Sequence, residues 1–389
     1  MFNIFYLKIL KKDGSELFCE KGDKISAVYA GEYSEGDKII LHCNEGSFVK
    51  MQLDESLKES IVYLQSGDFE FEIPYGALMA GYDKAAFSGN EHKISVSQLT
   101  DEEIFGTRNI ALNSHDRRGH KKSYPHAYAN FVTREDPCFF ERNAIDGVCR
   151  NENHGGYPYH SWAGGAREDL EYYIDFGREV EVEKVVFFLR ADFPHDTYWK
   201  NIDVEFSDKS RVTASFEETA DGQALILPEK KKTSIIHLTG FKQAVNPLSW
   251  AALSQVEVYG NYIKEDLSKM EIRCASNPKD AKHYTTDRLR EEFHIANMFT
   301  KDNARMVYSH IDRIITAGFM PVLCELKLEG GKELASDYFL ERREMGCINI
   351  GGKGIITVDG VDYEMNPRDG IYIGMGNKEI TFKSCDVNA

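Results

Sequence analysis

The chain has 389 residues, a length that predicts roughly two to four domains of ordinary size. Its formal net charge is -16, which would repel a phosphate backbone and argues against nucleic acid as a partner. Aromatic residues make up 12% of the chain and fit the pleated, half-buried surfaces of sheets, so we expect β-rich domains.

The cysteines and the first residues of the chain indicate the cellular compartment of the protein. Eight cysteines are scattered without a CxxC pair, a pattern that favours free thiols in a reducing compartment. Residues 1–8 have no basic stretch before their apolar run, so they indicate a strand rather than a signal peptide. No run approaches the ~18 apolar residues of a membrane-spanning helix. We therefore expect a cytoplasmic protein without a membrane partner.

Residues 1–105 alternate short strand patterns with turn residues. The segments that read as strands are 25–29, 38–42, 48–53, 60–64 and 69–73. Gly36-Asp37 and residues 66–68 supply turn chemistry between them. This pattern predicts a small β-sandwich.

Residues 106–262 form a second β-rich block. Val and Phe alternate along 182–190, the pattern continues at 202–206, and closing strands are expected at 234–238 and 255–259. Polar residues follow, and 264–269 is the stretch that we expect to form a domain boundary.

Residues 270–389 change character. Pro278 suits the first turn of a short helix, and Thr286 is the expected cap of a second helix over 287–293. Asp359-Gly360 separates two apolar runs and is the strongest hairpin signal in the chain. Eight glycines lie between Gly346 and Gly376, so the pattern predicts a small barrel or jelly roll.

Two stretches of this last part carry a resemblance to a known family. They are MVYSHIDRII at 306–315 and YFLERREMGCINIGGKGIITVDG at 338–360. Both resemble the amino-terminal half of 5-keto-4-deoxyuronate isomerase, an enzyme of pectin and glycosaminoglycan breakdown. The resemblance implies that residues 270–389 form one cupin-like barrel half of such an isomerase.

The resembled family implies a definite chemistry. Its members have two tandem cupin barrels, form hexamers and convert 4-deoxy-L-threo-5-hexosulose uronate to 3-deoxy-D-glycero-2,5-hexodiulosonate. This ketol isomerisation needs an electrophile on the carbonyl oxygens and a base that shuttles the proton. The family's electrophile is a zinc held by three His and one Glu in the second cupin.

The sequence departs from the family at that zinc. The expected strand at 337–344 has no histidine, and none occurs after His310. Zinc needs three or four ligands, so we expect no cofactor within this chain and no isomerisation by the chain alone. We expect either self-association or a partner chain that supplies the missing cupin. Two alternatives remain open: an oligomerising remnant, and a truncated or fused reading frame.

Several residues of the last part are candidates for uronate chemistry. Arg313, Arg342 and Arg343 could bind the substrate carboxylate, because Arg grips carboxylates with two hydrogen bonds. The alternative is a salt-bridged strand beside neighbouring Glu residues. His310 is the candidate proton shuttle, and the alternative is a buried histidine or one at a subunit contact.

The middle block is the candidate glycan-binding region. Six of the twelve histidines lie between His115 and His195, among many Tyr and Trp. Residues 143–147, Trp162 and 172–177 weakly resemble a galactose-binding-like jelly roll. The sugar-binding candidates are His160, Trp162, Arg190, His195 and Trp199, and the resemblance makes Asp146 a candidate for a structural Ca²⁺. The alternative is an aromatic-rich core with surface histidines.

The sequence therefore predicts an all-β protein in three parts. A small β-sandwich over 1–105 is followed by a galactose-binding-like jelly roll over 106–262 and a cupin-like half over 270–389. The resemblance implies uronate catabolism. The rival hypothesis is a carbohydrate-binding protein without catalysis of its own, whose ligand is a glycan.

Overall fold

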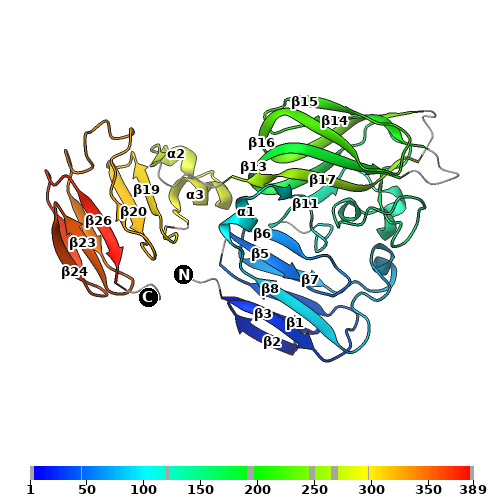
Figure 1. Cartoon of the computed structure of the whole chain (residues 1–389), viewed down its shortest axis with the longest axis horizontal. Helices are drawn as coiled ribbons and strands as arrows, with labels where there is room; N and C mark the ends of the chain where they lie inside the picture. The colour runs from blue at the N-terminus through cyan, green and yellow to red at the C-terminus, as the bar shows by residue number, and fades with distance from the viewer. Residues whose placement is uncertain are drawn as a thin grey trace. The chain divides into compact units, whose positions relative to one another are not determined.

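Figure 1 shows the computed structural model of the chain, which describes residues 4–44, 46–119, 122–190, 197–244, 250–263, 270–296 and 298–385. The chain divides into two compact units, residues 2–264 and residues 265–389. Strands dominate both, which confirms the all-β class. The expected boundary stretch 264–269 lies outside the described residues.

The first part of the larger unit is a sandwich of two sheets, with strand orders β2-β1-β4-β7 and β10-β6-β5-β8-β3. The strands of the first sheet are β1 (Phe5–Leu10), β2 (Glu16–Gly22), β4 (Lys38–His42) and β7 (Asp68–Glu72). Those of the second are β3 (Lys24–Tyr29), β5 (Ser47–Gln52), β6 (Ser60–Leu64), β8 (His92–Ser97) and β10 (Ser123–Tyr124). Alternate residues are buried between the sheets, as in Ile25, Ala27 and Tyr29. All five predicted strands are present to within a residue, whereas β2 and β8 were not predicted.

The rest of the larger unit is built on one strongly bent sheet, with order β12-β17-β13-β16-β14-β15 and with β11 and β9 added beside β13 and β17. Its strands are β9 (Arg108–Asn109), β11 (His126–Ala129), β12 (Trp162–Ala163), β13 (Tyr172–Leu189), β14 (Trp199–Glu205), β15 (Arg211–Ser215), β16 (Gln223–Gln243) and β17 (Ala252–Tyr262). The register of β13 shifts between Asp175 and Val180, where Gly177 has φ +70°. Such bulges let one long strand bend around a core.

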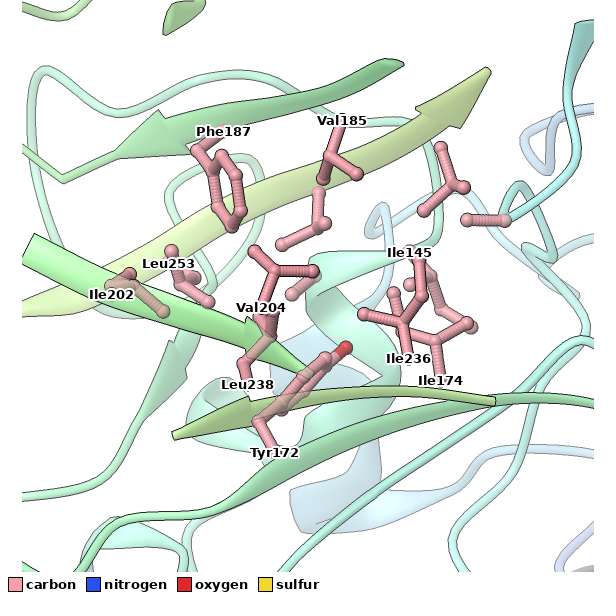
Figure 2. Packing of buried hydrophobic residues seen from close by; sticks show 14 of the residues in the cluster. Ile145, Tyr172, Ile174, Val185, Phe187, Ile202, Val204, Ile236, Leu238 and Leu253 are labelled. Carbon is pink, nitrogen blue, oxygen red and sulfur yellow. The ribbon is translucent and has the colours of Figure 1, made fainter. Parts of the chain in front are cut away.

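The core of this part lies between those bent strands. Figure 2 shows its side chains pointing toward one another from β13, β14, β16 and β17. The labelled residues are Ile145, Tyr172, Ile174, Val185, Phe187, Ile202, Val204, Ile236, Leu238 and Leu253. This part also packs on the sandwich, because Phe48 of β5 meets the ring of Tyr262 of β17 edge-on at 4.7 Å. In addition, β10, which falls in the second predicted part of the sequence, pairs with β6 of the sandwich. The first two predicted parts therefore lie in one compact unit.

Short helices connect these strands. They are η1 (Gly76–Gly81), α1 (Asp101–Phe105), η2 (Thr133–Glu135), η3 (Pro137–Phe139) and η4 (Glu141–Ala144). A capping box between Thr100 and Glu103 fixes the start of α1, because each side chain accepts a hydrogen bond from the other residue's backbone N–H.

The smaller unit contains three separate small sheets, with orders β18-β19-β20, β21-β26-β23-β24 and β22-β25. Its strands are β18 (Glu271–Arg273), β19 (Ala304–Ser309), β20 (Ile314–Phe319), β21 (Leu326–Lys327), β22 (Met345–Ile348), β23 (Gly354–Val358), β24 (Val361–Met365), β25 (Gly370–Ile373) and β26 (Ile380–Ser384). Its helices are α2 (Pro278–Ala281) and α3 (Thr286–Phe293).

Three sequence predictions can be checked in this unit. The hairpin at Asp359-Gly360 is confirmed, with φ +47° and +84° at these two residues. The cap of α3 is Thr285, one residue before the predicted Thr286. The strand expected at 337–344 is wrong: these residues form turns and bends, closed by a hydrogen bond from the Asp337 N–H to the Glu341 carboxylate at 2.8 Å.

Candidate functional site

The two tryptophans predicted to bind sugar are core residues. Trp162 and Trp199 are both fully buried, with ring centroids 5.9 Å apart. Phe241 packs against each of them, at 5.6 Å and 4.8 Å. Neither indole is accessible to a ligand. The prediction that Trp162 and Trp199 form an aromatic platform for sugar is therefore wrong. The crowding of aromatic residues in the sequence reflects a large core.

The candidates Asp146 and His160 form a buried polar pair. One carboxylate oxygen of Asp146 lies 2.6 Å from His160 Nε2, and the other accepts a hydrogen bond from the Val148 N–H at 2.9 Å. The guanidinium of Arg142 lies 3.8 Å away. Calcium requires six to eight oxygen ligands. Protein donors and a neighbouring cation occupy the Asp146 oxygens, so the surroundings of Asp146 do not fit that ion.

Arg142 joins this pair to the sandwich. Its guanidinium donates to the backbone carbonyls of Ser114, Asp116 and Gly81 at 3.0–3.1 Å, and it lies over the ring of Tyr82 at 4.3 Å. With a further bond to Asn143 Oδ1 at 3.2 Å, four hydrogen bonds hold the buried guanidinium of Arg142. The residue therefore holds loops together and is not exposed to a ligand.

Two more histidines of the predicted cluster are structural. His115 Nε2 accepts the Leu53 N–H at 3.1 Å, and burial together with the Arg142 charge lowers the pKa of His115 to about 3. For His126, burial opposes the charged form, but Asp116 at 2.7 Å outweighs it and raises the pKa. His120 and His195 lie outside the described residues.

A small pocket lies beside this polar pair. It has a volume of about 60 Å³, and its lining includes Lys58, Tyr82, Asp83, Arg142 and Tyr157. A water molecule needs roughly 10–15 Å³ of such volume. The pocket therefore has room for a few waters and is too small for a sugar ring.

One group of residues around the exposed Trp250, which we call the indole cluster, lies elsewhere in the middle part. It comprises Phe131, Gly165, Arg167, Arg190 and Trp250. Trp250 is 42% exposed, and the buried Arg190 donates from Nη2 to its backbone carbonyl. A Cβ on Gly165, which has φ +69°, would lie 3.4 Å from the Phe131 ring and 3.9 Å from the indole. Arg167 lies over the Phe131 ring at 5.0 Å.

The indole cluster combines the groups that carbohydrate recognition uses. An indole supplies a large apolar face, and guanidinium groups donate hydrogen bonds in a fixed geometry. Arg190 was predicted as a sugar-binding residue, but it is only 3% exposed and donates to the Trp250 carbonyl, so that prediction is corrected: Arg190 supports the position of Trp250. Trp250 itself was not predicted. Asn246-Pro247 shortly before Trp250 is turn chemistry that marks a loop, and this signal could have separated Trp250 from the two core tryptophans.

The candidates of the smaller unit lie on and beside its first hairpin. Arg313 has φ +54° in the turn after β19, and His310 is exposed near the same turn, so it is not a buried core histidine. The ring of Tyr308 meets His310 at 5.2 Å and Arg343 at 5.4 Å. His310 and Arg343 therefore both lie beside the ring of Tyr308.

The remaining candidate, Arg342, pairs with Glu341 at 3.4 Å. A guanidinium beside this carboxylate opposes a dication there, and 337–344 contains no imidazole. Among the residues that the structure describes, no group of three or more His, Cys, Asp or Glu side chains is placed to hold a metal. The donors of 337–344 do not fit the zinc of the resembled family.

Part of the chain is similar to known isomerases. No family model matches the chain. The 4-deoxy-L-threo-5-hexosulose-uronate ketol-isomerase of Lachnoclostridium phytofermentans is 62% identical over 117 residues, which are 30% of this chain and 42% of the relative. The enzymes of the same name from Lachnospira eligens and Halalkalibacterium halodurans are 57% and 50% identical over 117 residues, with the same coverage. The chain thus spans less than half the length of these relatives.

Similar solved structures are carbohydrate-binding modules. A chitosan-binding module of a Paenibacillus chitosanase/glucanase is 18% identical, covering 40% of this chain and 99% of the module, with a TM-score of 0.28. A Streptococcus pneumoniae fucose-binding module is 19% identical, covering 41% and 99%, with a TM-score of 0.29. At these TM-scores the likeness carries no weight for the function of this chain. None of the described helices has the length and apolar character needed to cross a membrane.

Proposed function

We propose that residues 270–389 are an isomerase-type part of a protein of uronate catabolism, and that they do not isomerise ketouronates by themselves. The observation that carries this proposal is the 62% identity to a ketouronate isomerase, over only 42% of that enzyme's length. The match extends over 117 residues, close in length to the segment 270–389 that carries the resemblance. A cupin-like fold for this half remains part of the proposal.

The side chains of this part suit binding better than catalysis. Arg343 is held by the rings of Tyr308 and Phe339, at 5.4 Å and 5.9 Å, and can present a cation to a uronate carboxylate. A ketol isomerisation also needs an electrophile on two neighbouring oxygens. The family's zinc supplies it when bound, and the donors near Arg343 do not fit zinc.

The test is an assay of the purified chain. Ketouronate turnover and bound zinc are measured, with the Lachnoclostridium enzyme as the positive control. The expected result is no turnover above background and far less than one zinc per chain. Zinc near one per chain, together with turnover that a chelator abolishes, would overturn the proposal.

The same proposal places the protein in the cytoplasm. None of the eight cysteines, all of which the structure describes, forms a disulfide, and four of them are exposed thiols that an oxidising compartment would put at risk. Mass spectrometry of the alkylated protein, isolated under conditions that trap thiols, should find all eight reduced. A native disulfide would contradict this placement.

A second candidate function, carbohydrate binding, is favoured by the exposed Trp250. Trp250 is 42% exposed, so a sugar ring could stack on its indole. Arg167, over the neighbouring Phe131 ring, is the guanidinium that could donate hydrogen bonds to the sugar hydroxyls. Each net hydrogen bond contributes roughly 0.5–1.5 kcal/mol, so the affinity should be modest. A glycan without catalytic turnover would be the ligand.

A glycan array followed by titration tests this candidate. Trp250→Ala should weaken any binder at least about tenfold, the equivalent of 1.4 kcal/mol. Ile226→Ala is the matched control, because Ile226 is also an exposed apolar residue of the same unit. An array without a binder, or equal effects of the two substitutions, would contradict carbohydrate binding at the indole cluster.

A further inference from the structure

The small pocket beside Asp146 lies where the sandwich meets the middle part of the larger unit, and we call it the junction pocket. Its lining includes Lys58 and Asp83 from the sandwich, with Arg142, Asp146 and Tyr157 from the middle part. The meeting of two folded parts is a common place for a ligand site. With a volume of about 60 Å³, the pocket excludes a sugar ring but has room for a small terminal group of a larger ligand.

Charged groups of both signs line the junction pocket. Arg142 and Asp146 are each 5% exposed and lie 3.8 Å apart, so they contribute charge to the wall rather than free hydrogen-bonding atoms. Lys58 is exposed and Asp83 is half-buried, so this second pair is open to solvent. A ligand ion of either sign would be attracted by two of these side chains and repelled by the other two. The lining therefore favours a neutral ligand group over an anion or a cation.

The lining offers hydrogen-bond donors and acceptors together. Lys58 Nζ donates to the Gly147 carbonyl, and an ammonium has two further N–H donors. One oxygen of Asp83 accepts the Ala85 N–H at 2.9 Å, and a carboxylate can accept several more hydrogen bonds. A neutral group that both donates and accepts matches this set. A hydroxymethyl group has that property, and its single carbon and oxygen fit the volume of the pocket.

Tyr157 is held at the pocket by both parts of the unit. Its backbone N–H donates to the Ala80 carbonyl of η1 at 2.8 Å. Its ring stacks on His160 at 5.2 Å, and His160 in turn lies 2.6 Å from the Asp146 carboxylate. Burial, together with the charges of Asp83 and Asp146, raises the pKa of Tyr157, so its hydroxyl stays protonated as a donor. A wall that is fixed before the ligand arrives loses less conformational entropy on binding.

We propose that the junction pocket binds a neutral hydroxymethyl group, with the rest of the ligand outside the pocket. A hexopyranoside and a small polyol such as glycerol both carry this group. The inference goes beyond the proposed function, because it depends neither on residues 270–389 nor on the indole cluster. It also separates a neutral sugar from a uronate, whose carboxylate replaces the hydroxymethyl group and would face Asp83 and Asp146.

Saturation-transfer NMR titrations of the full 389-residue chain test the pocket. The probes are methyl glucopyranoside, methyl xylopyranoside, methyl glucuronide and glycerol. The xyloside lacks only the hydroxymethyl group, and the glucuronide has a carboxylate in its place. We expect the glucoside to bind at least about tenfold tighter than either, because a site that hydrogen-bonds a hydroxyl rejects the analogue without it. Glycerol distinguishes a small polyol from a glycoside as the source of the group.

One substitution tests the charge balance of the lining. Asp83→Asn keeps an amide oxygen for the Ala85 N–H but removes a negative charge, so the glucuronide should gain about tenfold in affinity relative to the glucoside. Asp13→Asn is the matched control, because Asp13 also accepts the N–H two residues further on at 2.9 Å and is not a lining residue. Circular dichroism confirms that both variants are folded.

Equal affinities for the glucoside and the xyloside would overturn the proposal, as would a native chain that binds none of the four probes. An affinity ratio of glucoside to glucuronide that Asp83→Asn leaves unchanged would also overturn it, because the sugar would then bind elsewhere, as at the indole cluster. Glycerol that binds as tightly as the glucoside supports the pocket and identifies a small polyol as the ligand.

Discussion

The middle part of the chain and the smaller unit differ in how many of their large apolar residues are buried. The bent sheet of the middle part encloses 31 buried hydrophobic residues, including two tryptophans, and its described residues leave only Tyr128, Ile226 and Trp250 exposed among the large ones. The core of the smaller unit has eleven buried residues, fewer than the 13 large hydrophobics that this unit exposes. The middle part buries most of its large apolar residues, whereas the described residues of the smaller unit expose more of them than their core contains.

This difference changes how an aromatic residue should be interpreted. In the middle part, most Trp, Tyr and His side chains stabilise the fold. The exposed Trp250 is the exception, and we assign it a candidate function in sugar binding. In the smaller unit, exposed large hydrophobic residues such as Tyr372 are common among the described residues. An exposed aromatic residue is therefore more informative in the middle part, where it is rare.

The largest expected effect separates core from surface tryptophan. Trp199→Ala should lower the free energy of unfolding of the larger unit by about 3–5 kcal/mol, because it removes a fully buried indole and leaves a cavity. Trp250→Ala should cost below about 1 kcal/mol. Urea unfolding followed by circular dichroism gives both values, and similar losses for the two would contradict the assignment of one to the core and the other to the surface.

The next prediction concerns how the free energy of unfolding of the larger unit depends on pH. The pKa of His115 is lowered to about 3 in the folded chain from 6.5. Between these values the unfolded chain binds more protons, so stability rises with pH, by at most about 1.4 kcal/mol per pH unit from this group. The contribution is present above pH 6.5 and is lost as the pH falls toward 3.

Urea titrations at pH 7 and pH 4.5 measure this loss. His115→Gln should reduce the difference between the two titrations, because glutamine can still accept the Leu53 N–H but does not titrate. The smaller unit has no buried histidine among its described residues, so its transition should depend less on pH in this range. An unchanged difference in the variant would contradict the role of His115.

A smaller effect compares two glycines. Gly177 of β13 has φ +70°, and a Cβ there would lie 2.3 Å from the Tyr124 ring, so Gly177→Ala should cost about 2–3 kcal/mol. Gly360 of the Asp359-Gly360 hairpin has φ +84° but open space around it, so Gly360→Ala should cost only about 1 kcal/mol. Thermal melts of both variants check the order, and a reversal would show that the close packing at Gly177 is unimportant.

Local sequence signals predicted the regular elements well. Alternation identified strands such as β3 and β6, and Asp359-Gly360 identified its hairpin, because both signals depend on residues a few positions apart. The strand expected at 337–344 failed because hydrogen bonding within the segment, from Asp337 to Glu341, closes turns there. The candidate residues depended on burial, which is set by distant segments. The sequence could not tell that Trp162 and Trp199 pack on Phe241 while Trp250 remains exposed.

Amide hydrogen exchange tests the contrast between the two regions most directly. Slow exchange reports the free energy needed to open each strand. We expect the central amides of β13 and β16 to exchange only through global unfolding of their unit, and those of β22 and β25 to exchange with an opening free energy lower by at least about 3 kcal/mol. Equal protection of the two pairs of strands would contradict the conclusion that the smaller unit buries its strands less completely than the middle part does.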